Sequence, residues 1–299
     1  MPKRVLITGT STGFGRDTAE RLARRGDHVF ATMRDVVGRN ATHREALEKL
    51  ATQEGLRLRV LELDVTDQRS VDSAIATALE EAGDLDVVIN NAGVAALGIT
   101  EAFTVDQFEQ IFNVNVHGAI RVNRAVLPSM RRQRSGLLVH ISSGAGRVTI
   151  PALAAYCASK YALEAIADAY RYELLPFGVD SIVVEPGVYR TGIHDRWISP
   201  ADTVRIAEYG STAEFAQRVD GVFQAIVGAS EAPGSGEVVD ALVALIDMAP
   251  EHRPFRTVVS APIQQLLATY NASAEALRPV VAQIFNVPEL AGSRVPEVG

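Results

Sequence analysis

The chain has 299 residues, of which 47% are hydrophobic and 22% charged, as expected for a soluble globular protein with a sizeable core. Its 29 basic and 36 acidic side chains give a net charge of −7, so neither a nucleic-acid nor an anionic-membrane partner has electrostatic support. The single cysteine, Cys157, excludes an internal disulfide and a multi-cysteine metal site, and we expect no metal. No apolar run approaches the ~18 residues of a membrane span, and the run after Arg4 is too short for an export signal. We therefore expect a cytoplasmic protein without a membrane partner.

Short β-branched runs alternate with longer amphipathic stretches through most of the chain. Strands are expected at residues 4–8, 28–33, 57–63, 86–90, 136–142 and 180–185, with a seventh at 256–260. Helices are expected between them, at residues 15–25, 44–54, 68–81, 105–132, 154–175 and 237–248. Several strands are apolar almost throughout, as in a parallel sheet buried on both faces. The alternation predicts an α/β fold of right-handed βαβ units, a doubly wound, Rossmann-like parallel sheet of about seven strands.

Two segments in the C-terminal third depart from this alternation. Because no linker or repeat divides the chain, we expect one domain over residues 1–299 that includes both segments. Residues 188–236 are rich in glycine, serine and charged residues and contain Trp197 and Phe223. They form either a substrate loop that covers a ligand or a helical excursion that packs its own aromatic side chains. Residues 262–299 form a C-terminal extension, expected to be helical with an interruption at Pro279, which completes the pocket or contacts another subunit.

Tyr156 and Lys160 mark a candidate proton-handling site. Four residues apart on a predicted helix, they share a face, and Ser143 lies upstream at the end of a predicted strand. A phenol with a pKa near ~10 is a poor acid–base catalyst at neutral pH, and a neighbouring ammonium is expected to lower that pKa. Ser142 is a rival for the hydroxyl role, but its one-residue offset on a strand turns it to the opposite face.

The first predicted strand runs directly into a glycine-rich turn. Glycines in such a turn permit close approach to a pyrophosphate, whose charge the N-terminus of the following helix stabilises. The turn comprises Thr8, Gly9, Ser11, Gly13, Phe14 and Gly15. The spacing of its glycines differs from the G-x-G-x-x-G fingerprint, and no Gly-Lys-Ser/Thr follows as in a P-loop. Taken alone, this loop is consistent with a dinucleotide site or with a purely structural turn.

The end of the second predicted strand, Met33-Arg34-Asp35, should meet the adenosine ribose of a dinucleotide. An acidic residue there bonds the 2′-hydroxyl of NAD, whereas an arginine accommodates the 2′-phosphate of NADP. Met33 cannot accept a hydrogen bond from the ribose, and Arg34 can pair with a phosphate. Asp35 keeps NAD open if the register shifts by two residues. We favour NADP(H) over NAD(H).

Together these motifs resemble the single-domain branch of the short-chain dehydrogenase/reductase superfamily. The family's Thr-Gly-x-x-x-Gly-x-Gly is present at residues 8–15 and its Asn-Asn-Ala-Gly at residues 90–93. Its active-site residues match Asn115, Ser143, Tyr156 and Lys160, and its Pro-Gly turn with a downstream Thr matches Pro186, Gly187 and Thr191. Each motif is short, but their ordered occurrence from the first strand to Thr191 is specific. The first half looks closest to members that act on steroids or retinoids.

The resemblance implies hydride transfer between a nicotinamide and the carbonyl or alcohol of a small apolar or ring-containing substrate. Tyr156 would be the general acid/base, with Ser143 donating to the same oxygen. Lys160 would lower the pKa of Tyr156 and hold the nicotinamide ribose, and Asn115 would position Lys160 through water. The remaining cofactor contacts would be Asp64 and Val65 at the adenine, Asn90, Ala92 and Gly93 beside the ribose and nicotinamide, and Pro186, Gly187 and Thr191 at the nicotinamide end. Family members often form homodimers or homotetramers.

Simpler interpretations and two other functions stay open. Cys157 beside Tyr156 is more often a small core residue than a reactive thiol, and His117 has no neighbouring ligand set. A nucleotide-sensing regulator would keep the fold but lose the proton relay, whose four residues are all present here. A sugar epimerase or dehydratase with retained NAD needs a sugar-nucleotide domain, for which the C-terminal part leaves little room. The leading expectation is an NADP(H)-preferring carbonyl reductase or alcohol dehydrogenase.

Overall fold

The computed structural model describes residues 2–229, 234–260 and 263–287. Within these residues seven strands form one sheet in the order β3-β2-β1-β4-β5-β6-β7, and every neighbouring pair is parallel. The strands are β1 (Arg4–Thr8), β2 (His28–Met33), β3 (Leu58–Glu62), β4 (Val87–Asn90), β5 (Gly136–Ile141), β6 (Val179–Pro186) and β7 (Arg256–Val259). The predicted doubly wound parallel sheet is confirmed, and the strand bounds differ from those expected by no more than one residue at either end.

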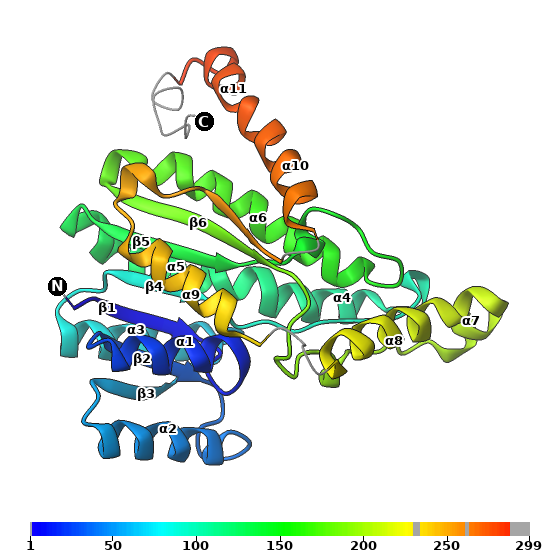
Figure 1. Ribbon diagram of the computed structural model, residues 1–299, viewed down its shortest axis with the longest axis horizontal. Helices are drawn as coiled ribbons and strands as arrows, with labels where there is room; N and C mark the ends of the chain where they lie inside the picture. The colour runs from blue at the N-terminus through cyan, green and yellow to red at the C-terminus, as the bar shows by residue number, and fades with distance from the viewer. Residues whose placement is uncertain (1, 230–233, 261–262, 288–299) are drawn as a thin grey trace.

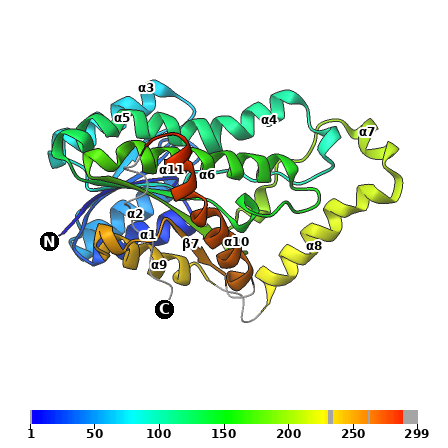
Figure 2. The same ribbon diagram turned by 90° about the horizontal axis from the view of Figure 1, so that it is seen from above.

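Helices cover both faces of this sheet. Figure 2 shows α3, α5 and α6 on one face and α1, α2 and α9 on the other. Their bounds are α1 (Gly13–Arg24), α2 (Ala41–Glu54), α3 (Gln68–Ala82), α4 (Val105–Phe112), α5 (Gly118–Gln133), α6 (Ala154–Leu174), α7 (Thr203–Glu208), α8 (Phe215–Gly228), α9 (Gly236–Asp247), α10 (Gln264–Ala276) and α11 (Arg278–Ile284). None of the helices in the described ranges is long and apolar enough to cross a membrane.

Alternate residues of the central strands face the two helical layers. Val5 and Ile7 of β1 belong to the cluster that contains α1 and α9 residues, whereas Leu6 belongs to the cluster beneath α3 and α5. All three side chains are completely buried, and each such burial contributes about 1.5–3 kcal/mol. Burial on both sides explains why these strands read as continuous apolar runs.

The strand order reverses between β1 and β4, and this reversal positions the site. From β1 the chain winds outward to β2 and β3, and then returns to β4 on the other side of β1. The loops that follow β1 and β4 therefore diverge from one another at the carboxyl ends of the strands. Open α/β sheets bind ligands in the crevice at such a point.

The long helix expected at residues 105–132 is interrupted. A π-helical turn at Asn113–His117 separates α4 from α5, and Pro128 lies inside α5. A search for apolar residues at the 3.6-residue spacing of an α-helix does not detect the extra residue of a π turn. Such turns are frequent at functional sites. Here it turns Asn115 into the interior, where only 2% of the residue is exposed.

The segment expected to cover a ligand projects beyond the carboxyl edge of the sheet. It contains a short 3-10 helix at His194–Arg196, then α7 and α8, which extend away from the body in both views (Figures 1 and 2). In the C-terminal extension the predicted interruption is present, because Pro279 lies in the first turn of α11 and separates it from α10. Residues 230–233 of the predicted loop, and residues 262 and 288–299 of the predicted extension, lie outside the described residues.

Candidate active site

A cavity of about 800 Å³ follows the carboxyl edge of the sheet, from the loops after β1, β2 and β3 to α6 and α10. Its volume is in the range of small-molecule and cofactor sites. The predicted site residues that line it are Gly9, Ser11, Gly13, Phe14, Arg34, Asp64, Val65, Ala92, Gly93, Ser143, Tyr156, Lys160, Pro186, Gly187 and Thr191. Residues from six separate loops, far apart in the sequence, therefore converge on one space.

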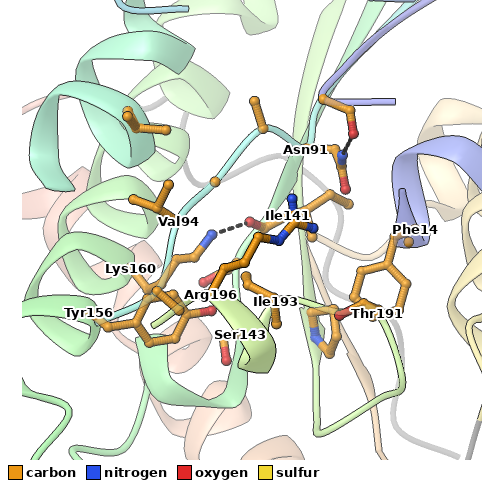
Figure 3. Close-up of a pocket in the computed structure, with 18 of the residues that line it drawn as sticks. Phe14, Asn91, Val94, Ile141, Ser143, Tyr156, Lys160, Thr191, Ile193 and Arg196 are labelled. Atoms are coloured by element: carbon orange, nitrogen blue, oxygen red, sulfur yellow. Dashed lines mark hydrogen bonds between the residues drawn. The ribbon is translucent and has the colours of Figure 1, made fainter. Parts of the chain in front are cut away.

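Ser143 and Tyr156 meet on the wall of this cavity. Ser143 follows β5 in an extended conformation, and its Oγ accepts a hydrogen bond of 3.1 Å from the main-chain N–H of Ala145. The Ser143 side chain also hydrogen-bonds the Tyr156 phenol, which favours the phenolate. Figure 3 shows the two side chains next to one another. Two hydroxyls from different elements can thus address a single substrate oxygen.

Lys160, one turn further along α6, is buried and points toward β5. Its Nζ donates to the Ile141 carbonyl at 2.8 Å and lies 5.7 Å from the centroid of the Tyr156 ring (Figure 3). Burial lowers the pKa of Lys160 to about 8, although the nearby Glu164 carboxylate raises it. Burial raises the pKa of Tyr156 to about 12, and the hydrogen bond from Ser143 opposes this only partly.

Burial is the main influence on the pKa of Tyr156 in this arrangement, and a lowering of that pKa by Lys160 stays a prediction. The ammonium is directed at a main-chain carbonyl, and desolvation of the phenol is the larger effect. Sequence spacing places both groups on one helix face, but it does not show how deeply each is buried. At neutral pH the arrangement holds a protonated phenol beside a lysine that is a much stronger acid.

Asn115 fixes the loop after β4 to the neighbouring helices. Its Oδ1 accepts from the N–H of Val94 at 2.8 Å, and its Nδ2 donates to the Val94 carbonyl and to Ser159 Oγ, both at 2.9 Å. A Cβ added to Gly93 would lie 3.4 Å from Asn115 Oδ1 and 3.7 Å from Lys160 Nζ. Asn115 and Lys160 thus border the same small space at Gly93, and a link between them through water stays a prediction.

Thr8 and Gly15 shape the glycine loop from beneath without lining the cavity. Thr8 Oγ1 accepts from the N–H groups of Asn91 and Ala92, both at 3.0 Å. Asn91 Nδ2 in turn donates to the carbonyls of Thr8 at 2.8 Å and Gly9 at 2.9 Å. A Cβ on Gly15 would lie 2.4 Å from Asn91 Nδ2 and 2.5 Å from the Gly9 carbonyl oxygen, so no larger residue fits.

Of the two asparagines at the end of β4, Asn91 lines the cavity and the predicted Asn90 does not. Asn90 is buried and donates from Nδ2 to Asn123 Oδ1 of α5 at 2.9 Å, on the side away from the cavity. Its alternation with Asn91 on the strand explains the difference, because successive side chains point to opposite faces. The repeated Asn-Asn was visible in the sequence, and strand alternation could have separated the two roles.

The end of the cavity after β2 carries more positive charge than expected. Arg34 lines it as predicted, and Arg39 joins it from the following turn, with His43 of α2 also in the lining. Asp35 has a φ of 51°, and its Oδ2 accepts from the N–H of Arg39 at 2.8 Å. This hydrogen bond folds the carboxylate back onto its own loop, from which Arg39 reaches the cavity. No pattern in the sequence indicates the path of that loop.

The other end of the cavity is apolar. Trp197 and Phe223, from the segment after β6, face each other with ring centroids 5.6 Å apart, and both line the cavity. Further apolar lining comes from Val148, Ile150, Leu153, Ile193, Ile198, Ile263, Leu266 and Leu267. Trp197 and Phe223 therefore pack together and form part of the cavity wall, whereas the covering of a ligand by residues 188–236 stays a prediction.

A buried cluster of charged side chains lies between α6 and the strands β6 and β7. Ser142 donates to Glu164 Oε1 at 2.7 Å, and Glu164 Oε2 accepts from Arg256 Nε at 3.1 Å. Glu185 lies beside them and accepts at Oε2 from Asn271 of α10 at 2.7 Å. Ser142 is therefore committed to this cluster, in agreement with its expected orientation away from Tyr156. Cys157 is a buried core residue and His117 is exposed, as their simpler interpretations predicted.

Comparison with known proteins identifies relatives over the part of the chain that builds the site. The family model described as short chain dehydrogenase matches residues 3–201. A 3-ketodihydrosphingosine reductase of Bacteroides thetaiotaomicron is 36% identical over 194 residues, which are 65% of this chain and 66% of the relative. The 17-beta-hydroxysteroid dehydrogenase type 1 of Homo sapiens is 37% identical over 203 residues, 67% of this chain and 61% of the relative. Each match spans slightly less than two thirds of the relative's length.

The likeness to solved structures extends further along the chain. A short-chain dehydrogenase from Streptomyces avermitilis superposes with a TM-score of 0.76 at 29% sequence identity, covering 96% of this chain and 98% of that one. The family match contains the glycine loop, both hydroxyls and the lysine, whereas Phe223, Ile263 and Leu267 lie beyond it. On the match over residues 3–201, the chain belongs to the short-chain dehydrogenase/reductase family of NAD(P)-dependent oxidoreductases.

Proposed function

We propose that this protein interconverts a carbonyl and an alcohol on an apolar substrate with NADP(H), and that Tyr156 is the general acid/base. The observation that carries the proposal is the hydrogen-bonded pair of Ser143 and Tyr156, set between a glycine loop and an apolar pocket in one cavity. A dinucleotide and a hydrophobic substrate can meet there, and the two hydroxyls mark the place where the reacting oxygen would bind.

The residues around the glycine loop fit a dinucleotide. Gly9 has a φ of 71°, and a Cβ there would lie 2.8 Å from the Ala92 Cα, so the loop passes close to the strand end. Helix α1 begins at Gly13 with no acidic residue in its first turn, which leaves its positive end available to an anion. When bound there, the nicotinamide would supply or accept the hydride. Gly93, Pro186 and Thr191 would hold its ring end.

Tyr156 is suited to the reductive direction. Its phenol is protonated at neutral pH because burial raises its pKa to about 12. An alkoxide is more basic than a phenolate, so proton transfer from Tyr156 to a newly formed alkoxide is favourable. Ser143 would donate a second hydrogen bond to that oxygen and stabilise its charge. Lys160, with a pKa of about 8, is a strong enough acid to return a proton to the phenolate through the site.

Preference for NADP(H) is supported by the charge at the adenosine end. Arg34 and Arg39 line that end, and the Asp35 carboxylate, which could have accepted the 2′-hydroxyl of NAD, is used in its own turn. Asp64, the acidic residue in the described lining, follows β3 and accepts from Thr66. A 2′-phosphate would therefore meet cations and no competing carboxylate from β2. Comparing kcat/KM for NADPH and NADH checks this preference.

An apolar substrate is supported by the far wall of the cavity. Leu153, Trp197 and Phe223 give that wall a largely hydrocarbon surface, and Leu267 closes it from α10. The names of two relatives refer to a 3-ketodihydrosphingosine and a 17-beta-hydroxysteroid, both largely hydrocarbon molecules with a ketone or hydroxyl group. We propose that residues 188–229 cover such a substrate.

The test is a panel of ring ketones, long-chain ketones and aldehydes, with sugar ketones as polar controls, followed by oxidation of NADPH. Tyr156→Phe should lower kcat about 100- to 10,000-fold, because it removes the proton donor, while the affinity for NADP⁺ stays within about two-fold. Tyr161→Phe is the matched control on the same helix, since Tyr161 is partly exposed and lies outside the cavity lining. Undiminished turnover by Tyr156→Phe would refute the role of the phenol.

A further inference from the structure

The segment between β6 and α7 lies directly against the glycine loop. A Cβ added to Gly13 would lie 3.0 Å from the Thr191 Cβ, so the two backbones approach closely. Thr191, Ile193 and Arg196 of this segment line the cavity, and Figure 3 shows the Arg196 side chain lying across the cavity between Lys160 and Thr191. The segment therefore faces the cofactor end of the cavity as well as its substrate end.

Arg196 already reaches the glycine loop. Its Nη2 donates to Thr12 Oγ1 at 3.1 Å, and its Nε donates to the Gly192 carbonyl at 3.3 Å. No carboxylate among the described residues forms an ion pair with its guanidinium, which has five N–H donors in a planar fork. Arg196 thus presents unpaired positive charge to the loop, in the geometry that matches phosphate oxygens.

The N-terminus of α1 and Arg196 meet at Thr12, at the same end of the cavity. Thr12 occupies the N-cap position, but its side chain makes no capping hydrogen bond, so the first N–H groups of α1 keep their donor capacity. The other described cations of the lining are placed elsewhere. Arg34 and Arg39 follow β2, and Lys160 donates to the carbonyl of Ile141.

We propose that Arg196 binds the pyrophosphate of the dinucleotide and thereby holds residues 191–197 closed over it. This inference rests on the proposed function, because it requires a dinucleotide at the glycine loop. Two groups from separate segments, the N-terminus of α1 and the guanidinium of Arg196, would then bind the same anion.

The contact also connects the cofactor to the substrate wall. Trp197 directly follows Arg196 in the sequence. It packs against Phe223 of α8, and its Nε1 donates to Asp220 Oδ1 of the same helix at 2.8 Å. When the pyrophosphate holds Arg196, it therefore fixes Trp197 and one face of α8 at the apolar end. Dinucleotide binding should precede and improve binding of the substrate.

The experiment uses Trp197, the single tryptophan of the chain, as an internal reporter. Titration with NADP⁺ should change its fluorescence in the wild type. In Arg196→Ala the affinity for NADP⁺ should fall about ten- to a hundred-fold, as expected for loss of a hydrogen bond to a charged group, and the fluorescence change should disappear at saturation. Arg218→Ala, which removes an exposed arginine of the same segment that stacks on Phe215, is the matched control.

A second ligand separates a phosphate contact from general damage to the site. Adenosine 2′-monophosphate lacks the pyrophosphate, so Arg196→Ala should bind it with wild-type affinity, whereas Arg34→Ala should bind it more weakly. Wild-type NADP⁺ affinity in Arg196→Ala, an intact fluorescence change, or equal losses for both ligands would each overturn the role of Arg196. If the wild type itself binds neither NADP⁺ nor NAD⁺, the proposed function fails, which is a different result.

Discussion

Glu185 offers a sharp test of the buried charged cluster behind the active site. It is fully buried at the end of β6, directly before the Pro186-Gly187 turn. Its Oε1 lies 3.7 Å from Arg256 Nε and 3.9 Å from Arg147 Nε, and no described group hydrogen-bonds that oxygen. Burial first, and then repulsion from Glu164, raise the pKa of Glu185 to about 7. Desolvation therefore outweighs the two arginines.

The raised pKa makes stability depend on pH. Because the folded-state pKa lies above the unfolded value of 4.5, the contribution is fully present below pH 4.5 and is lost as the pH rises toward 7. Between pH 5.5 and 7 this amounts to ~1.5 pH units at about 1.4 kcal/mol each, or roughly 2 kcal/mol. Glu185→Gln cannot ionise, so it should escape this loss.

The assay is urea unfolding of wild type and Glu185→Gln at pH 5.5 and pH 8. The free energy of unfolding of the variant, relative to the wild type, should rise by roughly 2 kcal/mol between the two pH values. Glu109→Gln, an exposed carboxylate on α4, should show no such rise. A constant difference would mean that Glu185 does not titrate in this range. A difference that falls with pH would mean that its ion pairs stabilise the fold, and either result refutes the reasoning.

Two predictions concern the cofactor end of the cavity. Arg34→Ala should weaken NADPH about ten-fold and leave NADH within about two-fold, because an exposed arginine contributes one charge-assisted contact to the 2′-phosphate; isothermal titration with both cofactors checks this, and equal losses would contradict the assignment. Gly15→Ala should abolish detectable dinucleotide binding and destabilise the fold by about 1–3 kcal/mol, since its Cβ would meet Asn91 and the Gly9 carbonyl at 2.5 Å or less. Gly228→Ala, where a Cβ meets nothing within 4 Å, is the control for urea unfolding, and a similar loss in both would contradict the steric argument.

The strands and the motif residues of this protein could be predicted because both follow from short, local sequence patterns. Short β-branched runs located all seven described strands, and motif spacing located Ser143, Tyr156 and Lys160 on one cavity. The misassigned features depend on burial and on loop paths. Strand alternation, applied to Asn90 and Asn91, would have separated a core asparagine from the one that holds the loop. By contrast, no local pattern shows that Tyr156 is desolvated enough to raise its pKa.

Arg39 and Leu267, two lining residues outside the predicted motifs, were harder to place because a turn or a contact between distant segments brings them to the cavity. Arg39 reaches the cavity only because the Asp35 turn reverses the chain. Leu267 reaches it from α10, whose position depends on Asn271 bonding the buried Glu185. Neither contact leaves a periodic trace in the sequence, since each joins residues through a turn or across the sheet.

Helix α6 links the candidate active site to the C-terminal extension. Tyr156, Lys160 and Glu164 are spaced four residues apart along one face of this helix. Tyr156 lies in the cavity wall, Lys160 donates to the carbonyl of Ile141, and Glu164 belongs to the buried cluster. The charge of Glu164 raises the pKa of Lys160, and Arg256 of β7 fixes Glu164. Glu185 also lies near Arg256, and its Oε2 accepts a hydrogen bond from Asn271 of α10. Helix α10 is therefore held by Asn271 to Glu185, which lies in the same cluster as the Glu164 that raises the pKa of Lys160, so a change in this cluster should be measurable both at α10 and at Lys160.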